Sequence, residues 1–95
     1  FYDLMYVNHS FTRQYAFIRK YKNEVLIVIV NFSDEDVKVS VNIPEHAFDY
    51  LGIDKKKYSV TELLNDRKLE LDFSEQQKIT DTIDAYRGNA YKFTI

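Results

Sequence analysis

The chain has 95 residues, enough for one domain with one hydrophobic core and too few for a catalytic barrel. Hydrophobic residues make up 45% of it, which argues against intrinsic disorder, and eight Tyr and seven Phe supply large core side chains. The 13 basic and 15 acidic residues give a net charge of −2, which excludes the strongly basic character of proteins that bind nucleic acid or an anionic membrane. The absence of cysteine excludes disulfides and thiol catalysis.

Strand patterns occupy the beginning of the chain. The segment Phe1–Val7 is rich in aromatic and aliphatic residues and predicts a strand, which a polar loop over residues 8–13 ends. Alternation in Tyr15–Tyr21 predicts a second strand, with Ala16 and Ile18 on the face opposite to the tyrosines. Lys22 and Asn23 then predict a tight hairpin turn.

The segment Glu24–Phe32 is the strongest structural signal, because it holds six consecutive apolar residues from Val25 to Val30. Such a run predicts a central strand that is covered on both sides. One face carries Leu26, Val28, Val30 and Phe32, and the other carries Val25, Ile27 and Ile29. Since a strand of a two-layer sandwich normally has one face in water, a cover is needed over the second set. A helical segment of the same chain or a neighbouring domain fits that requirement.

The next segment, Val37–Ile43, alternates apolar and polar residues after an acidic turn at residues 33–36, and predicts a half-buried strand. The strands up to this point are expected to form an antiparallel meander. Pro44 followed by an early Glu, with Gly52 at the end, predicts one or two helical turns over 44–51 that direct Ala47, Phe48 and Leu51 to the sheet.

The remaining segments predict two hairpins. Tyr58–Leu64 and Lys68–Leu71 are expected to pair around a turn at Asn65 and Asp66, and Phe73–Thr80 reads as a polar loop. Thr82–Tyr86 and Ala90–Ile95 are expected to form a closing hairpin around residues 87–89.

These segments together predict one domain over residues 1–95. The expected fold is all-β, an antiparallel, Greek-key-like β-sandwich of about eight short strands with one short helical segment near 44–51. No run approaches the roughly 20 apolar residues that cross a membrane, so no membrane partner is expected. The chain begins inside an apolar segment, so we expect the native N-terminus to lie elsewhere, and the cellular location is not predictable.

The sequence contains no pattern typical of catalytic, cofactor-binding or metal-binding residues. Glycosidic hydrolysis needs two positioned carboxyl groups, but the acidic cluster 34–36 is expected in a solvated turn, and Asp81 and Asp84 look equally ordinary. His9 and His46 have no neighbouring ligand, no serine has a nucleophile-elbow context, and Gly52 and Gly88 stand alone. The lysine run 55–57 is interpreted as a solvated loop.

The tyrosines leave carbohydrate binding open. Exposed aromatic rings stack on sugar faces, and any of the eight tyrosines is a candidate platform: Tyr2, Tyr6, Tyr15, Tyr21, Tyr50, Tyr58, Tyr86 and Tyr91. Most of them lie on predicted strands, however, where core packing is the simpler interpretation. A third possibility is a general all-β protein-interaction domain.

Several motifs resemble the C-terminal domain of α-amylase-type enzymes in glycoside hydrolase family 13. They are Phe1–Tyr6, the segment Gln14–Tyr21 with Ala16-Phe17-Ile18-Arg19, the strand end Val28–Ser33 with Asn31-Phe32-Ser33, the hairpin Tyr58–Asp66 and the closing segment Ile83–Phe93. The resemblance covers nearly the whole chain and includes no catalytic motif.

This resemblance implies a non-catalytic sandwich that packs on the (β/α)8 barrel of the same parent chain and stabilises it, in an enzyme of starch or α-glucan metabolism. It also implies α-glucan as a possible second partner, through surface tyrosines, and no cofactor. Combined with the two-sided strand, it suggests that the interdomain surface contains Tyr2, Val25, Ile27 and Ile29.

Overall fold

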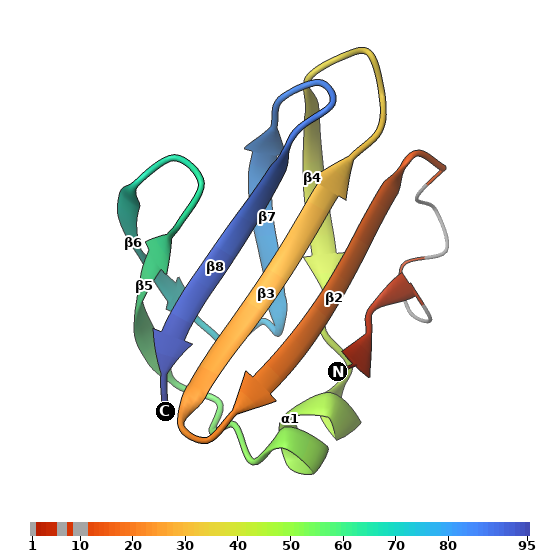
Figure 1. The fold of residues 1–95 in the computed structure, drawn as a ribbon. Coiled ribbons are helices and arrows are strands. Elements are labelled where there is room, and N and C mark those ends of the chain that lie inside the picture. Colours follow the sequence, from red (N-terminus) through yellow and green to blue (C-terminus); the bar gives the residue numbers. More distant parts are fainter. Residues whose placement is uncertain (1, 6–7, 9–11) are drawn as a thin grey trace.

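Two antiparallel sheets form the domain, and a computed structural model describes it for residues 2–5, 8 and 12–95 (Figure 1). The elements in chain order are β1 (Tyr2–Asp3), β2 (Gln14–Tyr21), β3 (Glu24–Asn31), β4 (Val37–Asn42), α1 (Glu45–Leu51), β5 (Lys57–Glu62), β6 (Arg67–Asp72), β7 (Lys78–Ile83) and β8 (Gly88–Thr94). Within the described residues, one sheet has the order β1-β2-β3-β8-β5-β6 and the other is the pair β4-β7. The predicted all-β antiparallel sandwich with a short helix is confirmed.

Strand β3 lies at the centre of the larger sheet, paired with β2 on one side and β8 on the other. Its Val25, Ile27 and Ile29 are 0% exposed and belong to the core between the two sheets. These three residues therefore have no surface left for a neighbouring domain, and the interdomain surface assigned to them is corrected. Their cover is the smaller sheet and the helix of the same chain, because side chains of both lie in the same core cluster. Tyr2, the fourth residue of that assignment, lies in β1, but its side chain is outside the described part.

The helix α1 closes the lower end of the sandwich in Figure 1. Ala47, Phe48 and Leu51 are buried, as the pattern predicted, and the Phe48 ring meets Phe73 edge-on at 5.3 Å between ring centroids. The helix ends at Gly52, whose φ of 68° is the left-handed conformation that glycine adopts without strain. The Lys20 ammonium group of β2 donates to the Leu51 carbonyl oxygen at 2.7 Å, which ties this helix end to the sheet.

The predicted meander is correct for β1, β2 and β3, which are antiparallel neighbours in the larger sheet, and it is wrong for β4. The predicted closing hairpin is wrong in its pairing. After β3 the chain crosses to the smaller sheet, where β4 pairs with β7 from Val37↔Ile83 to Asn42↔Lys78. Strand β8 then returns to the larger sheet and pairs with β3 and β5. The polar loop predicted up to Thr80 contains the first half of β7, whose outward Lys78, Thr80 and Thr82 hide the strand pattern. The β5–β6 hairpin is confirmed.

A buried asparagine holds the crossover between the sheets. The Asn31 side-chain amide donates to the carbonyl oxygens of Glu35 at 2.9 Å and Ile83 at 3.1 Å, and its oxygen accepts from the Ser33 amide at 3.0 Å. These bonds join the end of β3, the turn into β4 and the end of β7. The asparagine of the Asn31-Phe32-Ser33 motif is therefore a structural residue, which satisfies backbone groups where the chain changes sheets.

Candidate functional site

The solvent side of the larger sheet presents a band of apolar residues. Because side chains alternate along a strand, the residues between the buried ones point outward, and directly paired residues share a face. We call this surface the outer sheet face and define it as Tyr15, Phe17 and Arg19 of β2, Leu26, Val28 and Val30 of β3, and Ala90 and Lys92 of β8. Figure 1 views the sheet from this side and shows no described element in front of β3 or β8.

Pairing orders the outer sheet face into rows. Tyr15 is opposite Val30, and in the next row Phe17 is opposite Val28, which in turn is opposite Ala90. In a third row Arg19, Leu26 and Lys92 are neighbours, so Leu26 lies between two cationic side chains. The surface is thus apolar at its centre and charged along one border, where Glu24 pairs with Lys92 at 3.5 Å.

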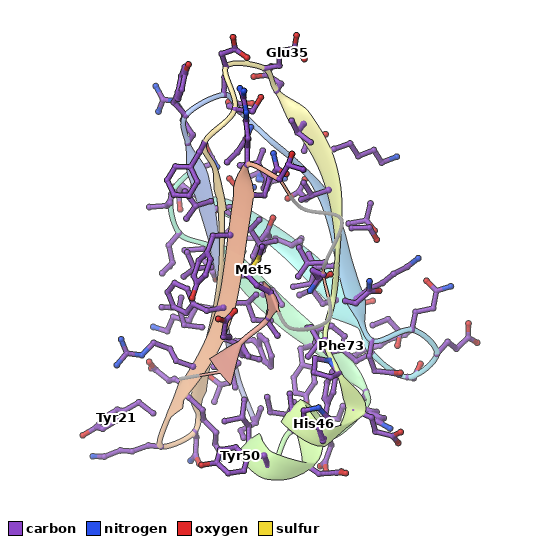
Figure 2. The ribbon with its side chains drawn as sticks, turned by 90° about the vertical axis from the view of Figure 1, so that its right-hand side faces the viewer. Met5, Tyr21, Glu35, His46, Tyr50 and Phe73 are labelled. Atoms are coloured by element: carbon purple, nitrogen blue, oxygen red, sulfur yellow. The ribbon has the colours of Figure 1, made fainter. Side chains whose placement is uncertain are left out.

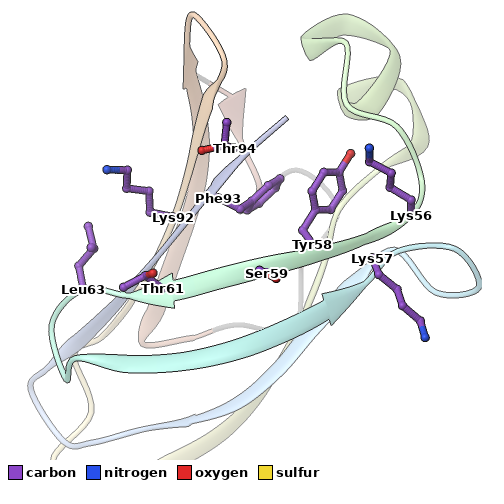
Figure 3. Close-up of a pocket in the computed structure, with 9 residues that line it drawn as sticks. All are labelled: Lys56, Lys57, Tyr58, Ser59, Thr61, Leu63, Lys92, Phe93 and Thr94. Atoms are coloured by element: carbon purple, nitrogen blue, oxygen red, sulfur yellow. The ribbon is translucent and has the colours of Figure 1, made fainter.

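A hollow continues the outer sheet face toward β5. The strands β5 and β8 pair only at Thr61↔Lys92 and Glu62↔Tyr91, and beyond these pairs they diverge. The open space between them has a volume of about 610 Å³ and is lined by residues that include Lys56, Ser59, Thr61, Leu63 and Lys92. Figure 3 shows Leu63 and Lys92 together at one end of this hollow.

A second hollow, of about 340 Å³, joins the first to the sheet. It is lined by Arg19, Tyr21, Leu26, Leu63 and Lys92, among others. Because Leu63 and Lys92 line both hollows, the two adjoin each other at these side chains.

The turn that contains Leu63 is held by a buried carboxylate. Glu62 is 0% exposed, and its carboxylate accepts from the Ala90 amide at 2.8 Å, the Leu64 amide at 3.0 Å and the Asn65 amide at 2.8 Å. The Asn65 side chain adds a fourth bond at 2.6 Å. Burial by itself raises the pKa of Glu62, but these hydrogen bonds outweigh it and hold the pKa below its ordinary value. Glu62 is therefore an anion inside the protein.

A second carboxylate lies close to this turn and joins both sheets. Asp81 of β7 accepts from the Arg67 guanidinium at 2.6 Å and from the Tyr91 hydroxyl at 2.7 Å. Burial raises the pKa of Asp81, and the bonds from Arg67 and Tyr91 outweigh this effect and lower it. For Tyr91, burial and then the Asp81 carboxylate raise the pKa. Sequence reasoning treated Asp81 as ordinary and did not single out Glu62, although Glu62 continues the inward side of Tyr58 and Val60.

This arrangement does not fit acid–base catalysis. A glycosidase pair needs one carboxyl group whose pKa is raised so that it can donate a proton, whereas the pKa of both carboxylates here is lowered. Their oxygens are occupied by hydrogen bonds that hold the β5–β6 turn and the strand β7 in place. The cluster therefore supports the shape of the surface above it and has the features of a structural network.

The remaining candidates lie apart from this surface. Asp34, Glu35 and Asp36 are exposed in the turn between β3 and β4, where an Asp36 oxygen accepts from the Ala85 amide at 2.9 Å. His46 is exposed on α1, and His9 lies outside the described residues. Over the ranges that the structure describes, no group of three His, Cys, Asp or Glu residues is placed to hold a metal ion. In the same ranges, no helix has the length and apolar character needed to span a membrane.

The exposed tyrosines are distributed over different elements. Tyr21 at the β2–β3 turn and Tyr50 on α1 lie toward the end of the domain that carries the helix, and Figure 2 shows both projecting there, while Glu35 marks the opposite end. Tyr86 lies between β7 and β8, at the opposite end from the helix. Tyr58 and Tyr91 are buried in the core.

Comparison with known proteins finds a matching family and solved structures that share this fold. The model of the family "Alpha amylase, C-terminal all-beta domain" matches residues 6–94. Among solved structures, alpha-galactosidase I from Mortierella vinacea has a TM-score of 0.64 and 17% identity over 87% of this chain and 21% of that one. A GH27 β-L-arabinopyranosidase from Geobacillus stearothermophilus has a TM-score of 0.62 and 11% identity over 90% of this chain and 18% of that one.

These structural matches establish a shared fold, and the chain spans about a fifth of the length of the two glycosidases. No curated protein sequence matches the chain significantly. The family match extends over nearly all of the sequence and agrees with the observed sandwich and with the motifs on β2 and β3. The chain belongs to the family of α-amylase C-terminal all-β domains.

Proposed function

We propose that this domain packs on the catalytic (β/α)8 barrel of an α-amylase-type glycoside hydrolase, in starch or α-glucan metabolism, and stabilises it without taking part in the reaction. The observation that carries the proposal is the outer sheet face. The inner face of the larger sheet is closed by the domain's own elements, while the apolar residues of β2 and β3 on the outer face stay half-buried. A contiguous apolar surface of this kind marks a contact with another protein surface.

The chemistry of the outer sheet face suits contact between domains of one chain. Aromatic and β-branched residues occupy its centre, and charged residues lie along its border, which is the usual arrangement of a stable interface. Contacts between domains bury about 600 to 1,500 Å². At about 25 cal/mol per Å² of apolar area, even part of such a contact stabilises both partners by several kcal/mol.

A pair of matched variants in the full-length parent enzyme tests this function. Val28→Glu places a charge at the centre of the outer sheet face, and Thr80→Glu places the same charge on the exposed side of the smaller sheet. We expect Val28→Glu to shorten the half-life of activity at elevated temperature by about tenfold or more, and Thr80→Glu to change it little. Unfolding of the 95-residue chain with each substitution corrects for effects within the domain itself. Equal half-lives in the parent would contradict the proposal.

Carbohydrate binding is the alternative function, and the exposed rings of Tyr21, Tyr50 and Tyr86 are the residues that support it. Titration of the 95-residue chain with maltoheptaose, followed by chemical-shift changes of the tyrosine rings, tests it directly. No response at millimolar ligand would eliminate this alternative.

A further inference from the structure

The β5–β6 turn exposes two adjacent leucines. Leu63 is 48% exposed and Leu64 is 63% exposed. Turns of this kind normally carry Gly, Asn, Asp or Ser, and the next two residues here, Asn65 and Asp66, fulfil that role. The leucines are therefore not required for chain reversal, and in the isolated domain they present apolar surface to water.

The conformation of this turn is built by the fold. The amides of Leu64 and Asn65 both donate to the buried Glu62 carboxylate, and the Leu63 amide donates to the Ala90 carbonyl oxygen at 2.8 Å. A buried anion is expensive unless it is fully hydrogen-bonded, and here the four bonds to it also fix the backbone that carries the leucines. The two side chains consequently start from a rigid backbone and lose little chain entropy when a partner binds.

The turn adjoins the outer sheet face. Leu63 lines the first hollow together with Lys92 (Figure 3). Both also line the second hollow, which includes Leu26 and Arg19. Leu63 therefore shares a hollow with Leu26 of the outer sheet face, and the second leucine follows it in the same turn. Lys92 already pairs with Glu24 at 3.5 Å, so a partner surface complementary to this region is apolar, with a carboxylate near Arg19.

We propose that Leu63 and Leu64 form a preorganised apolar anchor that inserts into the catalytic domain of the same parent chain, and that Glu62 is its positioning residue. This inference rests on the proposed function, since it specifies the contact by which the domain docks. A glycosidase catalytic domain is the chosen occupant because the two solved glycosidases that share this fold devote about four-fifths of their chains to other structure. Interfaces concentrate their energy in a few buried anchors of this type.

A thiol probe measures docking directly, because the 95 residues contain no cysteine. Val28→Cys is introduced in the full-length parent and in the 95-residue chain, and the rate of labelling at this position is followed by peptide mass spectrometry. Leu63→Ser and Leu64→Ser are then combined with it, and Tyr50→Ser serves as a control that removes an exposed ring elsewhere.

Labelling in the parent should be slower than in the 95-residue chain. The double leucine substitution should accelerate it about tenfold or more in the parent and leave the 95-residue chain unchanged, and Tyr50→Ser should have little effect in either. Protection of Val28→Cys that persists in the leucine variant would overturn the anchor and leave the proposed function intact. Equal labelling of the parent and the 95-residue chain would contradict both.

Discussion

Replacing Glu62 by Gln tests how much the buried carboxylate contributes to the fold. The side chain keeps its shape and loses its charge, and one of its two oxygens becomes an NH₂ group. In the native protein, one Glu62 oxygen accepts from the Asn65 amide and side chain, at 2.8 and 2.6 Å. The other Glu62 oxygen accepts from the amides of Leu64 and Ala90, at 3.0 and 2.8 Å. In either orientation, the new NH₂ group faces two donors.

The expected loss of stability in the Gln variant follows from these contacts. Two hydrogen bonds to a charged acceptor are lost, each of which contributes about 1.5 to 3 kcal/mol, and two donors are left without a partner. Removing the charge offsets part of this loss, because the buried anion no longer has to be desolvated. We expect the free energy of unfolding to fall by about 3 kcal/mol, a large part of the total of about 5 to 15 kcal/mol for a domain.

Urea denaturation of the 95-residue chain measures this change. The signal is tyrosine fluorescence or circular dichroism, since the sequence has eight tyrosines and no tryptophan. Glu70→Gln is the matched control, because Glu70 is exposed on β6 of the same hairpin, and we expect less than about 0.5 kcal/mol from it. If Glu62→Gln is no more destabilising than this control, the buried carboxylate does not hold the turn.

Three further outcomes follow from the same structure. The pKa values of Glu62 and Asp81 are lowered in the folded state, so both carboxylates stabilise the fold at any pH above their ordinary pKa of about 4. The free energy of unfolding should therefore fall as the pH drops below about 4. Asp81→Asn will make this fall shallower, as measured by urea titrations between about pH 2 and 7. Asn31→Ala removes the bonds across the sheet crossover and will cost about 2 to 3 kcal/mol in the same denaturation assay; a loss under 0.5 kcal/mol would contradict its structural role. Lys20→Met removes the cap on the Leu51 carbonyl and will cost about 1 kcal/mol by thermal unfolding, with unchanged stability as the contradicting result.

The β2–β3 hairpin shows what local pattern predicts well. Its strands have alternating or continuous apolar residues joined by a short polar turn, and such features depend only on residues close in sequence. The same reasoning predicted the buried residues of the helix and the inward residues of β4. The family motifs on these strands pointed to the correct family for the same reason, since they belong to contiguous segments.

The polar network could not be predicted in the same way. Glu62 looks like an ordinary surface residue until the amides of Ala90, Leu64 and Asn65 converge on it, and Ala90 is 28 positions away. Asp81 likewise acquires its role only when β7 brings it to Arg67 and Tyr91. Charged residues are expected at the surface unless partners are present, and the partners come from distant segments.

The sequence by itself determined that this is an all-β domain of the α-amylase C-terminal type, because strand periodicity and short motifs are local properties of the chain. It also identified the two apolar faces of β3. Only the tertiary structure decided which of these faces is the core, since Val25, Ile27 and Ile29 are as apolar as Leu26, Val28 and Val30. That choice depends on where β4, β7 and α1 pack, and those long-range pairings are decided by the fit of the whole chain.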